Sequence, residues 1–341
     1  MMFGGANSMV YTNTIQALIM VVVAIILLSS GFDFFKDGLG SLLDKLAAID
    51  PDLAKSSNSK SLLFRDFYEI IFAQTIVGIA VVVQPHIITK SLLLKKESQV
   101  NSFLTVAVVV EILFFLVVIA GLYARLLMPD LSVDGTPLKN DGIIPAYVIL
   151  RFAGSRLSVF VGLIVVMGLL SAGLSTLEGL VQSVSSSVTS DIIKPLAGEK
   201  NLSDKNYILI NKIVIIGLAI VSWIISRNQI LEPKLSVGIL AQNGVYAYFS
   251  AAFVPVLFGI FFKDTPRRIA ISSSIIALLV HFGIYYLIPF IHQHHALNLG
   301  FFTKFIEGSI RNPAIAASAA ILISTLFAGI YYIVVRKQKT R

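Results

Sequence analysis

Apolar residues fill long runs along this 341-residue chain, and polar residues gather in the short segments between them. A helix that spans the hydrocarbon core of a bilayer needs about 20 mostly apolar residues. The chain contains eight runs of this kind, which predict eight transmembrane helices. The runs cover residues 10–31, 66–88, 102–128, 153–190, 206–226, 237–262, 268–290 and 313–336.

Composition places the chain in the membrane class. Hydrophobic residues make up 56% of it and charged residues 13%, whereas about 25% of the residues of an ordinary soluble domain are charged. We therefore expect an all-α membrane protein. The 341 residues contain no cysteine, which excludes disulfides, thiol catalysis and thiolate metal sites within them.

The net charge of +8 reflects topology and does not indicate a nucleic-acid partner. The basic residues cluster in alternate loops, and the positive-inside rule makes such loops cytoplasmic. An even number of spans then puts both termini in the cytoplasm, in a protein of the cytoplasmic (inner) membrane. The first run lacks a basic leader and a cleavage site, which favours a span over a signal peptide. The clusters are Lys90, Lys95 and Lys96; Lys194, Lys200 and Lys205; Lys263, Arg267 and Arg268; and Arg336, Lys337, Lys339 and Arg341.

Two external segments carry patterns of their own. Residues 32–65 space Leu39, Leu42, Leu43 and Leu46 as one face of a short amphipathic helix, which would cap an external vestibule; a partly ordered loop is the alternative. Residues 291–312 contain "HQHH", which has metal-ligand spacing but reads more simply as a solvated loop without a nearby carboxylate.

The fourth run is unusually rich in oxygen. Its small residues recur every three or four positions and form one helix face. Such a stripe serves close helix packing in membranes, or contact with an ion or solute, and spacing alone leaves both interpretations open. The stripe consists of Gly168, Ala172, Thr176, Gly179, Ser183 and Ser187.

Two features of this run favour an ion. Ser175 and Thr176 follow Ala172 by three and four residues, so two hydroxyls and one backbone carbonyl converge beside the helix. Hard cations are bound by several oxygen ligands, and neutral oxygens suffice for a monovalent ion. Glu178 lies about 60° around the helix from Ser175. Its carboxylate either is simply solvated or lines an ion exit path towards the cytoplasm.

The segment "LLSAGLSTLEGLVQSVSSSVTSDI" resembles the sodium-site helix of sodium:solute symporters, a family that includes proline, pantothenate, monocarboxylate, sugar and iodide carriers. The resemblance continues in order along the chain. "YTNTIQALIM" is similar to the Thr-Asp-x-x-Gln start of a core helix, and "VVQPHIITKSLLLKKES" to a Gln-Pro-His segment. "ARLLMPDL" and "DGIIPAYVI" fit the next external loop, and "AAFVPVLFGIFFK" fits the last core helix.

The resemblance implies a LeuT-type transporter with two inverted repeats of five helices. Residues 1–31 would be the last helix of the first repeat, 32–65 the external loop, 66–262 the second repeat, and 263–341 two additional helices with a basic tail. The coupling ion would be sodium, and its ligands here would be the carbonyl of Ala172 and the hydroxyls of Ser175 and Thr176.

The chain departs from the family pattern in two places. Asn13 replaces the aspartate of the Thr-Asp-x-x-Gln motif, which removes a negative charge from the ion path. The chain also starts about five spans late, so the first core helix, with further sodium ligands and much of the solute site, is absent. We therefore expect an N-terminally truncated carrier that does not transport alone, or a partner that supplies the missing helices.

The resemblance favours the pantothenate, proline and monocarboxylate branch, and hence a small carboxylate-bearing solute. Gln74 and Gln84, on the run at 66–88, are the expected solute contacts. Another hypothesis is a solute sensor or regulatory subunit that keeps the transporter fold without transport. An enzyme is not expected, because the Glu and His residues show no spacing of a dyad, triad or metal site.

Overall fold

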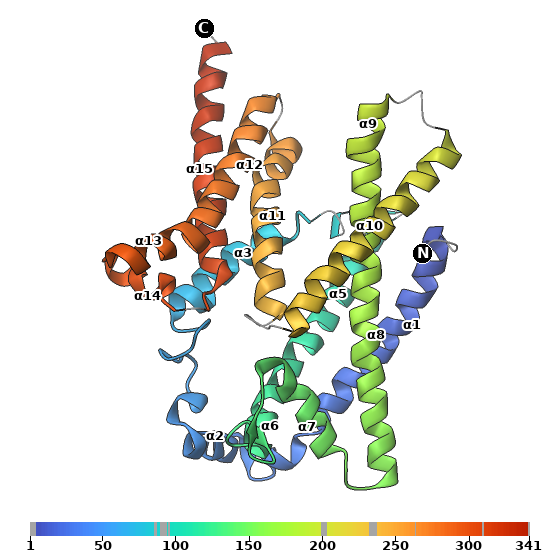
Figure 1. Cartoon of the computed structure of the whole chain (residues 1–341), viewed down its shortest axis with the longest axis vertical. Coiled ribbons are helices and arrows are strands. Elements are labelled where there is room, and N and C mark those ends of the chain that lie inside the picture. Colours follow the sequence, from blue (N-terminus) through green and yellow to red (C-terminus); the bar gives the residue numbers. More distant parts are fainter. Residues whose placement is uncertain are drawn as a thin grey trace. The chain divides into compact units, whose positions relative to one another are not determined.

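The structure, a computed structural model, describes residues 5–84, 87–88, 94, 96–198, 203–231, 237–262, 264–308 and 310–339. Helices dominate these residues (Figure 1). The described strands form one antiparallel pair, β1 (Ser132–Val133) with β2 (Thr136–Pro137), in a loop between helices.

Within the described residues, seven helices are long and apolar enough to cross a membrane, which confirms seven of the eight predicted spans and a multi-pass membrane protein. They cover Tyr11–Ser29, Ser98–Leu127, Arg156–Ala197, Lys205–Asn228, Val237–Phe261, Arg267–His295 and Pro313–Gln338.

The run at 66–88 forms a shorter helix than its length predicts. A π-helical turn, η3 (Tyr68–Ala73), continues into α3 (Gln74–Val81), and the helix ends there. The sequence gives a reason for the early end, because Pro85 lacks a backbone N–H and disfavours helical geometry in the residue before it. Pro85 and His86 themselves lie outside the described residues.

The chain forms two compact units. Unit 1 contains residues 1–54 and 92–234, and unit 2 contains residues 55–91 and 235–341. Each unit combines segments that are far apart in sequence, so neither is a contiguous domain.

Unit 1 is built around α1 (Gly5–Ser29) and α8 (Arg156–Ser187), which pack against each other. Its core gathers apolar residues of α1, α6, α7 and α8, with Tyr123 and Tyr147 fully buried at its centre. The remaining elements are η1 (Phe32–Phe35), α2 (Gly38–Ile49), η2 (Pro51–Ala54), α5 (Ser98–Leu116), η4 (Val117–Ile119), α6 (Ala120–Leu127), η5 (Asn140–Gly142), α7 (Ile143–Arg151), η6 (Val188–Ile193), α9 (Lys194–Ala197) and α10 (Asp204–Leu231).

The amphipathic segment in the first loop is a helix, as predicted. Leu42 and Leu46 of α2 are buried, whereas Leu39 and Leu43 of the same stripe stay exposed. The buried pair faces protein, because α2 packs against α6 within unit 1 (Figure 1). That α2 caps a vestibule stays a prediction.

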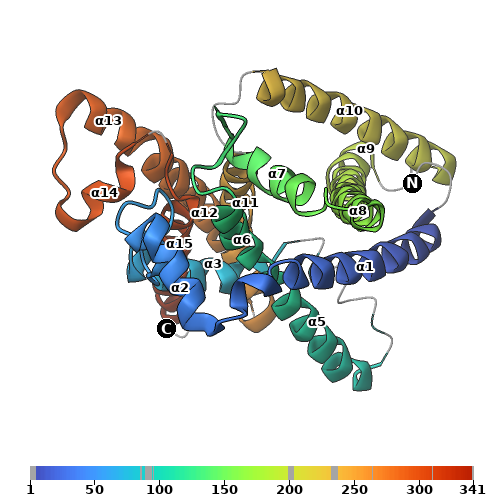
Figure 2. The ribbon, with the colours of Figure 1, turned by 90° about the horizontal axis from the view of Figure 1, so that it is seen from below.

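Unit 2 is a bundle of α11 (Val237–Phe261), α12 (Arg267–Phe282) and α15 (Pro313–Lys339), with α3 packed on α11 and α15. The three long helices lie side by side in both ribbon views (Figures 1 and 2). Their core joins Phe249 and Phe253 of α11 to Ala73 and Val77 of the short helix. The unit is completed by η7 (Gly283–Leu287), α13 (Ile288–His295), η8 (Gly300–Phe302) and α14 (Thr303–Ile306).

The "HQHH" run differs from its prediction as a solvated loop. It ends the helix α13, and His292 Nε2 lies 3.7 Å from Glu307 Oε1, so a carboxylate is nearby after all. The spacing within the run could not reveal this contact, because Glu307 lies further along the chain, at the end of α14. Among the residues the structure describes, no group of three or more His, Cys, Asp or Glu is placed to hold a metal ion.

Candidate ion and solute site

The oxygen-rich face of α8 meets α1 at close range. Ser155 starts α8 as its N-cap, where its Oγ accepts a hydrogen bond from the Ser158 backbone N–H at 3.2 Å. Further along, a Cβ added to Gly168 would lie 2.3 Å from Val23 Cγ2 of α1. Gly168 is therefore required for the two helices to approach, which is the packing role expected of a small-residue stripe.

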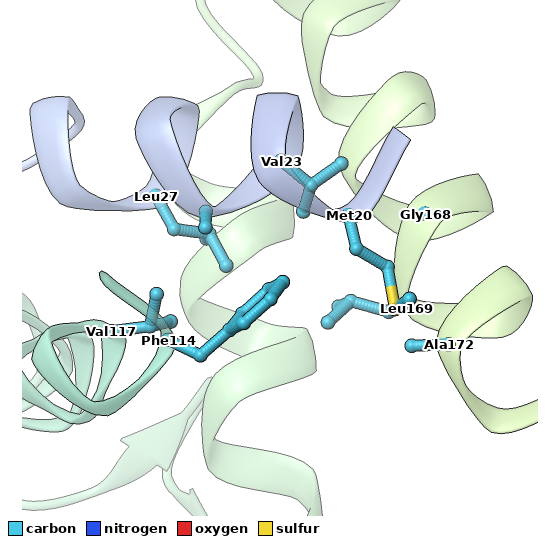
Figure 3. Close-up of a pocket in the computed structure, with 9 residues that line it drawn as sticks. Met20, Val23, Leu27, Phe114, Val117, Gly168, Leu169 and Ala172 are labelled. Atoms are coloured by element: carbon cyan, nitrogen blue, oxygen red, sulfur yellow. The ribbon is translucent and has the colours of Figure 1, made fainter. Parts of the chain in front are cut away.

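Next to this contact the helices leave a hollow of about 250 Å³ (Figure 3). Its wall consists of apolar side chains from α1, α5 and η4, with α8 on the remaining side, and Ala172 belongs to it. The lining residues are Met20, Val23, Ala24, Leu27, Phe114, Val117, Gly168, Leu169 and Ala172.

One turn beyond Ala172, α8 and α1 share a polar contact. Ser175 Oγ donates a hydrogen bond to Asn13 Oδ1 across 3.1 Å, and both residues are half-buried. The structure thus joins Asn13, which the sequence assigned to the ion path, to Ser175, an expected sodium ligand on a separate helix. An Oγ that donates its proton keeps its lone pairs available for a cation.

Thr176 and Ala172 are also joined, but within α8. Thr176 Oγ1 donates to the Ala172 carbonyl at 3.0 Å. The sequence suggested a free carbonyl here, and the structure shows one that accepts a side-chain hydrogen bond. Helical threonines commonly return their hydroxyl to the carbonyl four residues earlier. Two of the three oxygens expected to bind sodium therefore lie side by side on one stretch of α8, with Ser175 adjacent in sequence.

Two further polar side chains stand near this stretch in sequence. Glu178 is half-buried and makes no side-chain hydrogen bond among the described residues. Gln16, the last residue of the motif that contains Asn13, has a buried Oε1 without a hydrogen-bond partner in the described part of the chain. Sequence reasoning did not assign Gln16, although the motif contained the signal for it.

The two glutamines expected to contact solute belong to unit 2. Gln74 is the first residue of α3 and is half-buried. Gln84 is buried, and its backbone carbonyl accepts hydrogen bonds from the N–H groups of Ile87 and Ile88 at 2.9 and 3.1 Å. Both residues therefore belong to the short helix or to the segment that directly follows it.

A charged cluster precedes this short helix, and the sequence did not reveal it. Glu69 is fully buried, and its carboxylate accepts hydrogen bonds from Arg65 Nε and Nη2, each at 3.0 Å. Asp66 pairs with Lys304, whose ammonium also lies 4.1 Å from the centre of the Phe301 ring. Burial acts to raise the pKa of Asp66, but the hydrogen bond and charge of Lys304, together with backbone hydrogen bonds such as that from the Glu69 N–H, lower the pKa overall.

The comparisons with known proteins agree with the sequence resemblance. The model of the sodium:solute symporter family matches residues 1–277. The sodium/pantothenate symporter of Haemophilus influenzae is 27% identical over 279 residues, which are 81% of this chain and 53% of that protein. The high-affinity proline transporter PutP of Bacillus subtilis is 22% identical over 286 residues, 81% of this chain and 54% of the transporter.

A solved structure supports the fold. The substrate-bound outward-open state of a Na⁺-coupled sialic acid symporter aligns with a TM-score of 0.65 at 18% identity. The alignment covers 96% of this chain and 64% of that chain. This chain spans about half the length of the curated relatives it matches.

Proposed function

Because the chain belongs to the sodium:solute symporter family, we propose that it works in sodium-coupled symport of a small organic solute across the cytoplasmic membrane. The observation that carries the proposal is the contact between Ser175 on α8 and Asn13 on α1. It joins the segments that resemble the family's sodium-site helix and the start of a core helix, one turn along α8 from Ala172, which lines the apolar hollow.

The sodium ligands in this proposal are the Ala172 carbonyl and the hydroxyls of Ser175 and Thr176. Thr176 Oγ1 donates its proton to the Ala172 carbonyl oxygen, so the two oxygens lie 3.0 Å apart on one stretch of α8. A cation there would exchange part of its hydration shell for these oxygens, and hard cations require several such ligands. We propose that the remaining ligands come from a transmembrane segment outside residues 1–341.

The solute is proposed to be a small carboxylate-bearing molecule such as pantothenate, an amino acid or a monocarboxylate. The two curated relatives described above are named for pantothenate and proline. The short helix Tyr68–Val81 supports a solute site nearby, because transporters of this type bind solute where a membrane helix is interrupted. Gln74 and Gln84, at the start of α3 and just after it, are the proposed polar contacts.

The orientation in the membrane follows from charge. Arg267 and Arg268 start α12, and Arg336 and Lys337 lie near the end of α15. The positive-inside rule supports a cytoplasmic location for both ends, and so for the C-terminus.

Uptake in cells that carry variants at the native locus tests the proposal. Uptake of labelled pantothenate and proline is measured with an inward sodium gradient and with an equal potassium gradient. We expect sodium-dependent uptake that Thr176→Val abolishes. The matched control is Thr105→Val, because Thr105 is an exposed threonine of α5 whose Oγ1 donates to the Asn101 carbonyl at 2.9 Å in the same way. Equal uptake with both gradients, or unchanged sodium dependence in Thr176→Val, contradicts the proposal.

A further inference from the structure

Helix α12 carries an ionisable residue in the interior of a membrane span. His281 is fully buried, and it lies within the apolar helix Arg267–His295. Ionisable residues at such positions are costly and almost always face protein partners. The partner of His281 is Asn243 of α11, which is itself 4% exposed.

The hydrogen bonds fix the state of the His281 ring. Asn243 Nδ2 donates to the Tyr286 hydroxyl at 2.7 Å, which leaves Asn243 Oδ1 to face His281 Nε2 at 2.9 Å. An amide oxygen only accepts, so Nε2 carries the proton. Nδ1 is buried without a hydrogen-bond partner in the described part of the chain, so the ring is neutral. The Tyr285 ring lies nearly parallel to the imidazole, at 7° and 6.3 Å between centres, and the Arg311 guanidinium lies 5.5 Å from the centre of the Tyr285 ring.

A second polar link joins the same two helices two turns further along α11. Pro255 lies inside α11 and has no backbone N–H, so the carbonyl of Ala251 lacks its usual helical donor. Ser274 Oγ of α12 lies 2.8 Å from this carbonyl and 3.0 Å from the Ala270 carbonyl of its own helix. Its single proton is shared between the two acceptors, and α12 thereby supplies the bond that the proline removed.

Together the two links fix the register of α11 on α12. Asn243 and Ala251 are eight residues apart, or about 12 Å along a helix, and a slide of one residue moves each of them by about 1.5 Å. Such a slide would separate His281 from Asn243 and would take Ser274 away from the Ala251 carbonyl. Unpaired polar groups in an apolar interior are far more costly than a shift between apolar surfaces. The apolar contacts, such as those of Phe249 and Phe253, add packing to this register but have no hydrogen-bond partners to lose.

The register of α11 matters because α11 also packs on the short helix. Phe249 and Phe253 share a core with Ala73, Val77 and Ala80 of η3 and α3. We propose that His281 and Ser274 are positioning residues, which hold α11 in one register and through it place the helix that carries Gln74 and leads to Gln84. The link to solute binding rests on the function proposed above; the placement of α3 does not.

Hydrogen exchange of the purified protein tests the placement without any solute. His281→Leu removes the donor, whereas His281→Gln keeps an N–H close to the position of Nε2. We expect His281→Leu and Ser274→Ala to speed exchange in peptides of α11 and of residues 74–81 about tenfold, and His281→Gln to restore protection. The control is Ser272→Ala, because Ser272 Oγ bonds back to Arg268 O of its own helix, at 2.6 Å, and to no other helix among the described residues. Faster exchange confined to α11 and α12, or no rescue by His281→Gln, overturns the proposal.

A transport assay then separates this inference from the proposed function. If wild-type cells show sodium-dependent uptake, His281→Leu should raise the KM for solute about tenfold, as expected for one lost hydrogen bond, with little change in the maximal rate. An unchanged KM with a lower maximal rate overturns the placement of the solute contacts. If wild-type cells show no uptake, the proposed function fails, and the exchange experiment still decides whether His281 and Ser274 position α3.

Discussion

The two units bury their membrane helices to different extents. In unit 2, the most apolar windows of α11, the α12–α13 helix and α15 are 33%, 22% and 28% buried. In unit 1, the corresponding values are 17% for α1, 6% for the α5–α6 helix, 17% for α8 and its continuation, and 0% for α10. The long helices of unit 2 are therefore covered by protein to a greater extent, whereas those of unit 1 present more apolar surface for lipid or for other transmembrane segments.

The hydrogen bonds of polar side chains also differ between the two units. In unit 2, the buried Asn243 and His281 and the half-buried Ser274 bond between helices, and the fully buried Glu69 bonds to the segment before its own helix. In the middle of α8, by contrast, Thr176 bonds back to its own helix and is exposed. We interpret unit 2 as the stable frame and the α1–α8 face of unit 1 as the part adapted to exchange partners with an ion.

The test with the largest expected effect on stability removes one partner of an ion pair in each unit. Glu69→Ala leaves the Arg65 guanidinium, 13% exposed, without its carboxylate, and should cost about 3–5 kcal/mol of the free energy of unfolding. Asp33→Ala in unit 1 breaks a pair with Arg151 whose carboxylate is 54% exposed and screened by solvent, and should cost far less than Glu69→Ala. Denaturant titration in detergent compares the two. Equal costs would contradict the contrast.

A glycine substitution tests the α1–α8 contact. Gly168→Ala places a methyl group against Val23 and should destabilise the protein by about 1–3 kcal/mol. Gly173→Ala on the same helix meets no atom within 4 Å, and should stabilise it by up to about 1 kcal/mol through helix propensity. The same titration measures both variants. A similar response of the two would show that the helices do not approach closely at Gly168.

Restoring the family's aspartate should strengthen ion binding. Asn13→Asp puts a carboxylate next to Ser175, and the added attraction should lower the sodium concentration for half-maximal effect about tenfold. Asn101→Asp adds the same charge on exposed α5 and should leave it unchanged. The measurement is a sodium titration of uptake, or of the alkylation rate of a cysteine introduced by Ala172→Cys. A similar shift in both variants would indicate a nonspecific effect of charge.

The smallest expected effect is on the stability of the protein at low pH. The pKa of Asp66 is lowered from its ordinary value near 3.8, so its pairing with Lys304 stabilises unit 2 above that value and is lost as pH falls below it. Asp66→Asn should therefore cost under about 1 kcal/mol at pH 7, and this cost should vanish in acid, once the pH has fallen below the lowered pKa of Asp66. Thermal unfolding at several pH values checks it. A cost that persists in acid would assign it to packing instead of charge.

The sequence predicted the long helices well, because run length alone determines whether a helix spans a bilayer. It also predicted α2. Two motifs assigned Asn13 to the ion path and Ser175 to the sodium ligands, and these two roles stay predictions. The sequence missed the early end of the helix at Val81, since the apolar pattern continues past Pro85. The links of His281 to Asn243 and of Arg65 to Glu69 were not predictable from periodicity, because neither pairing leaves a signal in the hydrophobic pattern.

Alkylation at residue 172 tests the central claim most directly. Ala172→Cys keeps the backbone carbonyl, and peptide mass spectrometry of the protein from its native locus measures its labelling rate in sodium and in potassium. We predict that sodium slows labelling several-fold, that adding Thr176→Val removes this protection, and that adding Thr105→Val does not. Equal labelling in the two salts, or protection that survives Thr176→Val, would contradict a sodium site on this face of α8.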